Sequence, residues 1–234
     1  SAAGVGREIM EAVESYGLHN SFLSVRSSGL QENMEEAAFA GAAETYLFVS
    51  PTELLDWIKE VWTSFWLTRG MLYRSERIVR QGSAKLAIVV QQMFESQVSG
   101  VIFTTDPVSG RDVIVIEAGY GLGEGVVSGV VDVDRYYVDK IDGSVSSVHV
   151  GKKAFMVKQH SSGKGTSIVP VESDLRDVPC LAKDDIRANI AMALEEHYAL
   201  SQDIEFGIAN GKVRILQTRP VTTRGLGKAF FTGE

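Results

Sequence analysis

The chain has few of the residues on which disulfide-rich and membrane-spanning proteins depend. It contains one cysteine, Cys180, and five prolines among 234 residues. A single cysteine excludes an intrachain disulfide framework and a multi-cysteine metal site, and it fits the reducing cytoplasm. The longest apolar runs, such as 86–90 and 113–116, are strand-sized and far shorter than the ~18 residues of a membrane helix. We therefore expect a cytoplasmic protein that does not enter a membrane.

Several catalytic motifs are also missing. The sequence contains no P-loop, no His-Glu-x-x-His and no Gly-x-Ser-x-Gly, and its four histidines are scattered without metal-ligand spacing. The run GYGLGEG at 119–125 follows an apolar strand, as a dinucleotide loop would. Its glycines alternate, however, and do not fit Gly-x-Gly-x-x-Gly, so this run is only weak support for dinucleotide binding.

Net charge and glycine content further limit the classes of protein to which the chain can belong. The net charge is −7, from 23 basic and 30 acidic residues, which argues against a duplex nucleic-acid binder but not against an anionic ligand in a local basic pocket. Glycine is in excess, at 23 of 234 residues or about 10%, against ~7% in typical proteins. In a chain with little proline, this excess predicts special backbone positions within ordered structure.

Hydrophobic periodicity predicts an α+β fold with mostly antiparallel, hairpin-linked strands. Hairpins are expected around Asp142-Gly143 and Asn210-Gly211, which are dipeptides typical of two-residue turns. The long second helix is expected to begin after Ser50, with Pro51 in its first turn. The predicted helices are 5–16, 51–80 and 184–200, and the predicted strands are 22–26, 45–49, 85–93, 99–104, 112–118, 134–139, 145–150, 152–159, 203–208 and 212–217.

The last predicted hairpin carries a group of polar side chains. Asp203 and Glu205 are two residues apart and so point to one face of a strand, as do Gln217 and Arg219 on the partner strand. Carboxylates favour Mg²⁺, and both arginine and Mg²⁺ favour phosphate. The spacing alone is also compatible with a solvated sheet face that carries an ordinary acid–arginine pair.

Two further positions are candidates for nucleotide contacts. Arg26 ends a predicted strand and precedes Ser27-Ser28-Gly29, a combination of guanidinium, hydroxyls and backbone N–H groups that suits an anion. Gln91 follows the apolar run 88–90, where its amide could face an adenine. A surface arginine and an ordinary polar strand residue are the alternatives that these patterns leave open.

Taken in order along the chain, these segments resemble the ATP-binding domain of phosphoenolpyruvate synthases and pyruvate phosphate dikinases, and that of a related rifampicin-phosphorylating enzyme. Each segment is weak alone, but the ordered set is specific and spans nearly the whole chain. The matching segments are VRSS at 25–28, FAG at 39–41, ETY at 44–46, VQQM at 90–93, SGVIFT at 99–104, DPVSG at 106–110, GLGEGVVSG at 121–129, QDIEF at 202–206 and ILQTRP at 215–220.

The resemblance implies an ATP-grasp-like fold that holds ATP between two lobes and passes a phosphoryl group to a histidine on a swivelling domain. That phosphohistidine then phosphorylates pyruvate or a similar acceptor. Carried over by position, Arg26 would be a phosphate ligand with a catalytic role, and Arg219 would stabilise charge on the transferring phosphoryl group. Thr45 and Gln91 would contact the nucleotide. Mg²⁺ would be held by Glu205 and Gln217, with Asp203 close by.

The chain also departs from the family pattern. Family members begin with a Gly-Gly-Lys segment whose lysine contacts phosphate, and nothing similar precedes Val25. The Thr and Asp usual after Arg-Ser-Ser are Leu30 and Asn33, the Gln usual after Phe-Ala-Gly is Ala42, and a family proline is Val133. No phosphohistidine motif is present, although Arg224–Gly227 resembles the linker that opens the histidine domain.

We therefore expect an N-terminally incomplete domain from a longer protein. Residues 1–84 would be the remainder of the N-terminal lobe, 85–221 the C-terminal lobe, and 222–234 the start of a linker to a phosphohistidine domain, with an acceptor domain elsewhere. We expect these 234 residues to be inactive alone in pyruvate, water dikinase-type transfer. A truncated or degenerate module that serves as a scaffold or partner surface is the alternative.

Overall fold

The computed structural model describes residues 2–29, 45–66, 86–182 and 188–221. The chain divides into two compact units. The first contains Ser1–Met93 with Gln159–Thr166, and the second contains Phe94–Lys158 with Ser167–Glu234. Each unit has its own sheet and its own hydrophobic cluster, so each is described by itself.

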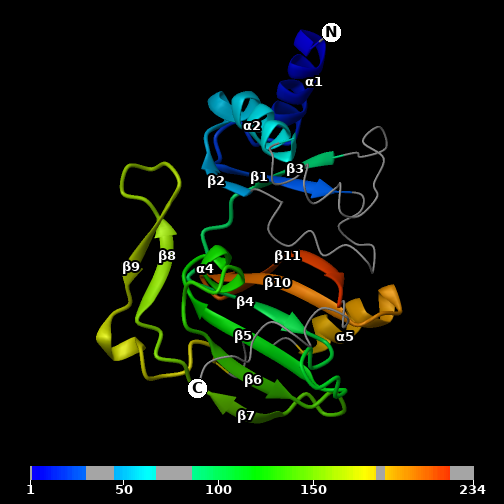
Figure 1. The fold of residues 1–234 in the computed structure, drawn as a ribbon, viewed down its shortest axis with the longest axis vertical. Helices are drawn as coiled ribbons and strands as arrows, with labels where there is room; N and C mark the ends of the chain where they lie inside the picture. The colour runs from blue at the N-terminus through cyan, green and yellow to red at the C-terminus, as the bar shows by residue number, and fades with distance from the viewer. Residues whose placement is uncertain (1, 30–44, 67–85, 183–187, 222–234) are drawn as a thin grey trace. The chain divides into compact units, whose positions relative to one another are not determined.

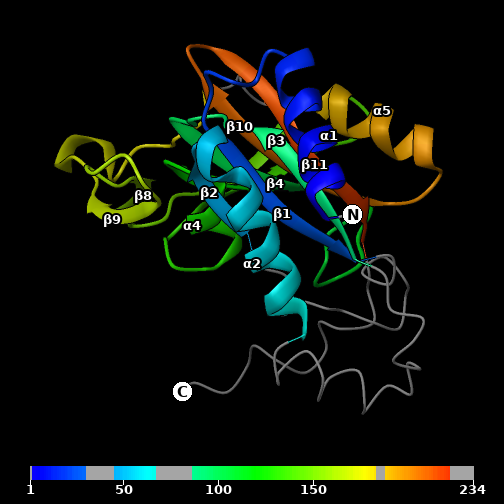
Figure 2. The same ribbon diagram turned by 90° about the horizontal axis from the view of Figure 1, so that it is seen from above.

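The first unit is a three-stranded antiparallel sheet with two helices on one face. Its strand order is β2-β1-β3, and α2 lies along the sheet in contact with all three strands (Figure 2). Leu23 and Val25 of β1 are fully buried between the strands and the helices, where they meet Val13, Leu54 and Val61. The elements are α1 Ala2–Ser15, β1 Leu23–Gly29, β2 Thr45–Val49, the 3₁₀ turn Pro51–Glu53, α2 Leu54–Trp66 and β3 Leu86–Gln92.

Helix α2 and the 3₁₀ turn before it begin at the position that the sequence predicts, after Ser50. Ser50 has an extended backbone, with φ −69° and ψ 140°, and Pro51 opens the 3₁₀ turn that leads into the helix. The Ser50 hydroxyl does not cap this turn; it pairs with the Thr52 hydroxyl at 2.8 Å, and the Ser50 carbonyl accepts from the Glu53 N–H. The part of the predicted helix beyond Trp66 lies outside the described residues.

The second unit is a six-stranded antiparallel sheet in the order β11-β10-β4-β5-β6-β7 (Figure 1). One of its faces packs against α5: Ile102, Ile116, Ile204 and Phe206 are buried there with Ala191. We call this the core face. The elements are β4 Val98–Phe103, β5 Ile114–Tyr120, α4 Gly123–Val127, β6 Asp134–Val138, β7 Val145–His149, β8 Phe155–Gln159, β9 Thr166–Pro170, the 3₁₀ turn Ser173–Leu175, α5 Ala188–Tyr198, β10 Gln202–Ala209 and β11 Lys212–Pro220.

The predicted α+β class with antiparallel sheets is confirmed, and the arrangement is compatible with an ATP-grasp-like fold. Asn210 and Gly211 both adopt positive φ, 51° and 69°, as a two-residue turn between β10 and β11 requires. Strand β9 was not predicted. The predicted lobe boundary after residue 84 differs from the division of the units, because β3 pairs along its length with β1 and so belongs to the first unit.

A fully buried ion pair holds three segments of the second unit together. Asp134 Oδ1 accepts from Lys153 Nζ at 2.5 Å and from the Gly151 N–H at 2.9 Å, and both charged side chains are almost completely buried. Asp134 Oδ2 accepts from the Cys180 N–H at 2.7 Å and from the Tyr136 hydroxyl at 3.3 Å. Burial raises the pKa of Cys180 above its ordinary range, and the nearby Asp134 carboxylate adds to this effect, so this thiol stays protonated at neutral pH.

Candidate functional site

Strands β10 and β11 bring four predicted site residues onto one face of the six-stranded sheet. In the register of this hairpin, Asp203 lies opposite Arg219 and Glu205 lies opposite Gln217. Residues directly opposite in an antiparallel pair point to the same side, and this side is opposite the core face on which Ile204 is buried. We call it the site face. The predicted grouping of the four side chains is confirmed.

Asp203 and Arg219 form a hydrogen-bonded ion pair. Arg219 Nε donates to Asp203 Oδ2 at 2.8 Å; the Asp203 side chain is 11% exposed, whereas that of Arg219 is 48% exposed. Burial raises the pKa of Asp203 above its ordinary value, since desolvation outweighs the lowering by Arg219, and the neighbouring Glu205 raises it further. An acid that is buried, paired with a guanidinium and adjacent to a second acid is typical of sites that handle charged ligands.

The donor set on the site face fits a magnesium ion that also contacts phosphate. Within the described part of the chain, no group of three or more His, Cys, Asp or Glu side chains converges as a metal cage. Mg²⁺ commonly takes one or two protein carboxylates and completes its shell with water and substrate phosphate. Glu205 and Gln217, paired across two strands, offer oxygens of that kind, and Arg219 offers a guanidinium for the phosphate itself.

The first unit brings its three predicted residues onto one face of its own sheet. Arg26 lies opposite Thr45 in the β1–β2 pair, and Gln91 lies opposite Ser24, two residues along β1. Val25 and Val90 alternate with them and pack against the helices, so Arg26, Thr45 and Gln91 point away from α1 and α2. Within this unit the predicted residues are therefore grouped on the face of the sheet that is opposite the helices.

The chain matches, over residues 3–229, the family model described as "Pyruvate phosphate dikinase, AMP/ATP-binding domain". The chain belongs to this family. It is 38% identical over 205 residues to a probable phosphoenolpyruvate synthase of Archaeoglobus fulgidus, covering 86% of this chain. It is 37% identical over 212 residues to a probable phosphoenolpyruvate synthase of Methanothermobacter thermautotrophicus and 33% identical over 223 residues to rifampicin phosphotransferase of Bacillus subtilis, covering 89% and 94% of this chain.

Membership of the AMP/ATP-binding domain family confirms the resemblance read from the ordered segments and supports ATP as the ligand. The chain spans about a quarter to a third of these relatives: 27%, 31% and 25% of their lengths, respectively. The relatives are phosphotransferases, and most of their length lies outside the matched region. In the described residues, no helix is long and apolar enough to span a membrane.

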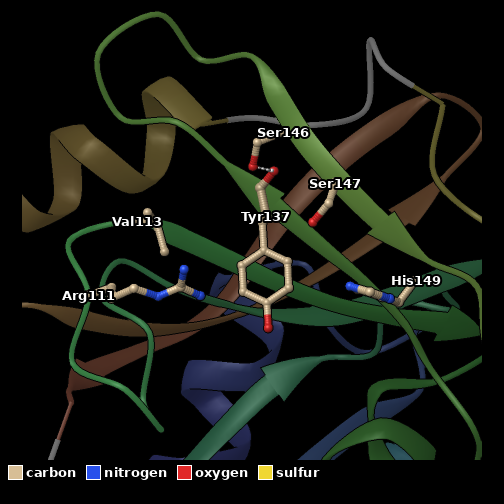
Figure 3. Close-up of a pocket in the computed structure, with 6 residues that line it drawn as sticks. All are labelled: Arg111, Val113, Tyr137, Ser146, Ser147 and His149. Carbon is tan, nitrogen blue, oxygen red and sulfur yellow. Dashed lines mark hydrogen bonds between the residues drawn. The ribbon is translucent and has the colours of Figure 1, made fainter.

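A separate hollow of about 290 Å³ lies on the β6–β7 side of the sheet and contains none of the predicted site residues (Figure 3). The Tyr137 ring lies between the Arg111 guanidinium, 5.7 Å from its centroid, and the His149 ring, whose centroid is 6.1 Å away. The hollow is open and shallow, and we do not assign it to the nucleotide. Its lining residues are Arg111, Val113, Tyr137, Ser146, Ser147 and His149.

Sequence reasoning missed the polar groups that support the site from the core face. Thr104, Glu195 and Gln202 form a hydrogen-bonded chain beneath Asp203. Thr104 is the residue after β4, Glu195 lies on α5 and Gln202 begins β10. No local spacing connects residues 104 and 202, which meet only because β4 and β10 pair. A polar residue at an inward position of a strand, such as Gln202 before the apolar Ile204, is the one signal that could have indicated it.

Proposed function

We propose that this chain is the nucleotide-binding part of an ATP-dependent dikinase-type phosphotransferase of the phosphoenolpyruvate synthase kind. Glu205 and Gln217 bind Mg²⁺, with Asp203 beside them, and Arg219 binds the phosphoryl group that is transferred. Arg26 binds phosphate, and Thr45 and Gln91 contact the rest of the nucleotide. The acceptor is a histidine on another domain, from which the phosphoryl group passes to pyruvate or a similar small molecule.

The observation that carries this proposal is the pairing of Glu205 with Gln217 and of Asp203 with Arg219 on one sheet face, within a family that binds AMP and ATP. Phosphoryl transfer depends on positioning and on neutralising charge more than on covalent chemistry by the protein. A bound Mg²⁺ would neutralise charge on the phosphates. The chain's own part is to orient the phosphates: Asp203 holds the Arg219 guanidinium through Nε at 2.8 Å, which fixes the position of its positive charge on the site face.

The proposal is tested by calorimetric titration of Mg·ATP into the wild-type protein and into Glu205→Ala and Arg219→Ala. We expect both substitutions to weaken binding at least tenfold, or about 1.4 kcal/mol. Excess EDTA should weaken ATP binding to the wild type and should remove most of the difference between the wild type and Glu205→Ala, because Glu205 acts through the metal.

Matched controls are Glu196→Ala on an exposed part of α5 and Arg7→Ala on the exposed surface of α1. Both should bind Mg·ATP as the wild type does. Wild-type affinity in Glu205→Ala and Arg219→Ala would contradict the assigned roles of these residues. No affinity of the wild type for Mg·ATP would favour a module whose ATP site is degenerate and whose role is that of a scaffold.

A further inference from the structure

The core face directly beneath the candidate site contains a buried polar chain that the proposed reaction does not use. Gln202 is 1% exposed and immediately precedes Asp203 in β10. Its Oε1 accepts from the Thr218 hydroxyl at 2.8 Å, and its Nε2 donates to the Leu200 carbonyl at 2.9 Å. Thr218 in turn immediately precedes Arg219 in β11.

The same chain continues through Thr104, the residue after β4, to α5. The Gln202 N–H donates to the Thr104 hydroxyl at 2.8 Å, and this hydroxyl donates to Glu195 Oε1 at 2.8 Å. Glu195 Oε2 accepts from Lys140 Nζ at 2.7 Å. Thr104 is fully buried, and its backbone N–H donates to the Gln202 carbonyl at 2.9 Å. Gln202 is therefore fixed on both its backbone and its side chain.

The Thr218–Gln202 hydrogen bond is a side-chain link between β11 and β10 at this end of the strand. Strand β11 is the terminal strand in the order of the described sheet, so β10 holds it from one side only. Gln202 and its opposite residue Pro220 share no backbone bond, because the Gln202 N–H and carbonyl both bond Thr104. A buried amide whose partners are all present has one favoured orientation, and the Thr218–Gln202 hydrogen bond therefore fixes the backbone next to Arg219.

We propose that Gln202 and Thr218 are positioning residues that hold the Arg219 guanidinium against Asp203. They contact no ligand, since they lie on the core face while Arg219 and Asp203 lie on the site face. The expected effect on nucleotide binding rests on the proposed role of Arg219 toward phosphate. The expected effect on the position of the Arg219 guanidinium does not. The experiment has a separate readout for each.

The test compares Thr218→Val, which removes the hydroxyl at nearly constant shape, with Thr218→Ser, which keeps it. The geometric readout is the NMR signal of Arg219 Nε–H. In the wild type and in Thr218→Ser we expect slow solvent exchange, because this N–H is bonded to Asp203. In Thr218→Val we expect exchange to be at least tenfold faster. Exchange as slow in Thr218→Val as in the wild type would overturn the proposal.

The functional readout is the affinity for two nucleotides. Thr218→Val should bind Mg·ATP about tenfold more weakly while its affinity for AMP is unchanged, and Thr218→Ser should restore both. Equal losses for AMP and ATP would indicate a general defect of the fold and would overturn the positioning role. Should the wild type bind neither nucleotide, the proposed function fails, while the exchange of Arg219 Nε–H still decides the positioning role.

Two further variants provide an independent test and a control. Gln202→Met removes the same hydrogen bond by changing its other partner, and it should give the same two readouts as Thr218→Val. Each variant can replace the other in the test if one of them is unstable. The control is Ser146→Ala on β7, at the opposite end of the described sheet, where a serine hydroxyl donates to the Tyr137 carbonyl at 3.1 Å. It removes one hydroxyl hydrogen bond and should leave both readouts unchanged.

Discussion

Asp203 is a site residue whose ionised form is unfavourable to the stability of the folded protein. Its carboxyl is buried next to Glu205, and only Arg219 offsets the cost of ionising it there, so its pKa is raised. An acid whose pKa is higher in the folded than in the unfolded state is more favourable to folding when protonated. The contribution of Asp203 to the free energy of unfolding is therefore fully present below its unfolded pKa, and it is lost as the pH rises through its folded pKa.

We therefore expect Asp203→Asn to raise the free energy of unfolding at pH 7, measured by urea denaturation with EDTA present. The amide keeps an oxygen for Arg219 but carries no charge to desolvate. The gain should disappear as the pH falls below the ordinary Asp pKa of about 3.9, where the wild-type side chain is neutral in both states. A lower free energy of unfolding for Asp203→Asn than for the wild type at pH 7 would show that the ion pair with Arg219 stabilises the fold by more than burial of the charge costs.

At the scale of elements, the Asp134–Lys153 pair joins parts of the second unit that are distant in sequence. Asp134 begins β6, Lys153 lies just before β8, and Cys180 lies after β9. The Asp134 carboxylate accepts hydrogen bonds from both Lys153 and the Cys180 N–H, so the two ends of the segment that contains β8 and β9 are attached at the same point. Val157 of β8 in turn accepts from the Leu122 N–H in the glycine-rich loop.

We expect Lys153→Met to lower the free energy of unfolding by about 3–5 kcal/mol, because it leaves the Asp134 carboxylate buried without its cation. The double variant Asp134→Asn, Lys153→Met removes both charges and should be more stable than Lys153→Met alone. Chemical denaturation of the two variants measures this difference. Equal stability would mean that the cost of the single substitution arises from packing and not from an unpaired charge.

At the scale of the molecule, the two units have separate cores. Leu23, Val25 and Leu54 belong to the cluster of the first unit, whereas Ile116 and Ile204 belong to that of the second, and no residue is shared. A cooperative transition depends on a common core, so the two units are candidates for separate unfolding.

We expect Leu23→Ala, which leaves a cavity at a fully buried position, to destabilise the first unit by about 2–5 kcal/mol. Hydrogen exchange should accelerate at the amides of β1 and β3 and stay unchanged at those of β4 and β5. Ile116→Ala is the matched control, with the opposite expectation. Equal acceleration in both sheets would show that the units unfold as one.

The sequence predicted much of the fold because local patterns sufficed for it. Alternating apolar and polar residues fixed the faces of β1 and β10, and Asn210-Gly211 fixed the turn that pairs β10 with β11. The turn sets the register as far as Phe206 and Ile215, and continued unchanged this register would place Gln217 opposite Ile204 on the core face. A bulge between Glu205 and Phe206 shifts the register by one residue and brings Gln217 opposite Glu205, which the turn dipeptide alone does not predict. The family could be recognised from the sequence because the order of the matching segments along the chain is specific, although each segment is weak alone.

Other parts of the site were decided only by tertiary structure. The pKa of Asp203 depends on burial, and the support from Gln202 and Thr218 depends on which face of the sheet α5 covers. The Asp134–Lys153 pair joins residues with no motif between them. Desolvation and long-range hydrogen bonds arise when distant segments exclude water from a shared space, and no spacing along the chain encodes that. The sequence by itself determined the family and placed the polar residues of the site on the last hairpin. Only the tertiary structure, through the bulge in that hairpin and the packing of the sheet, decided which of them pair and how firmly they are held.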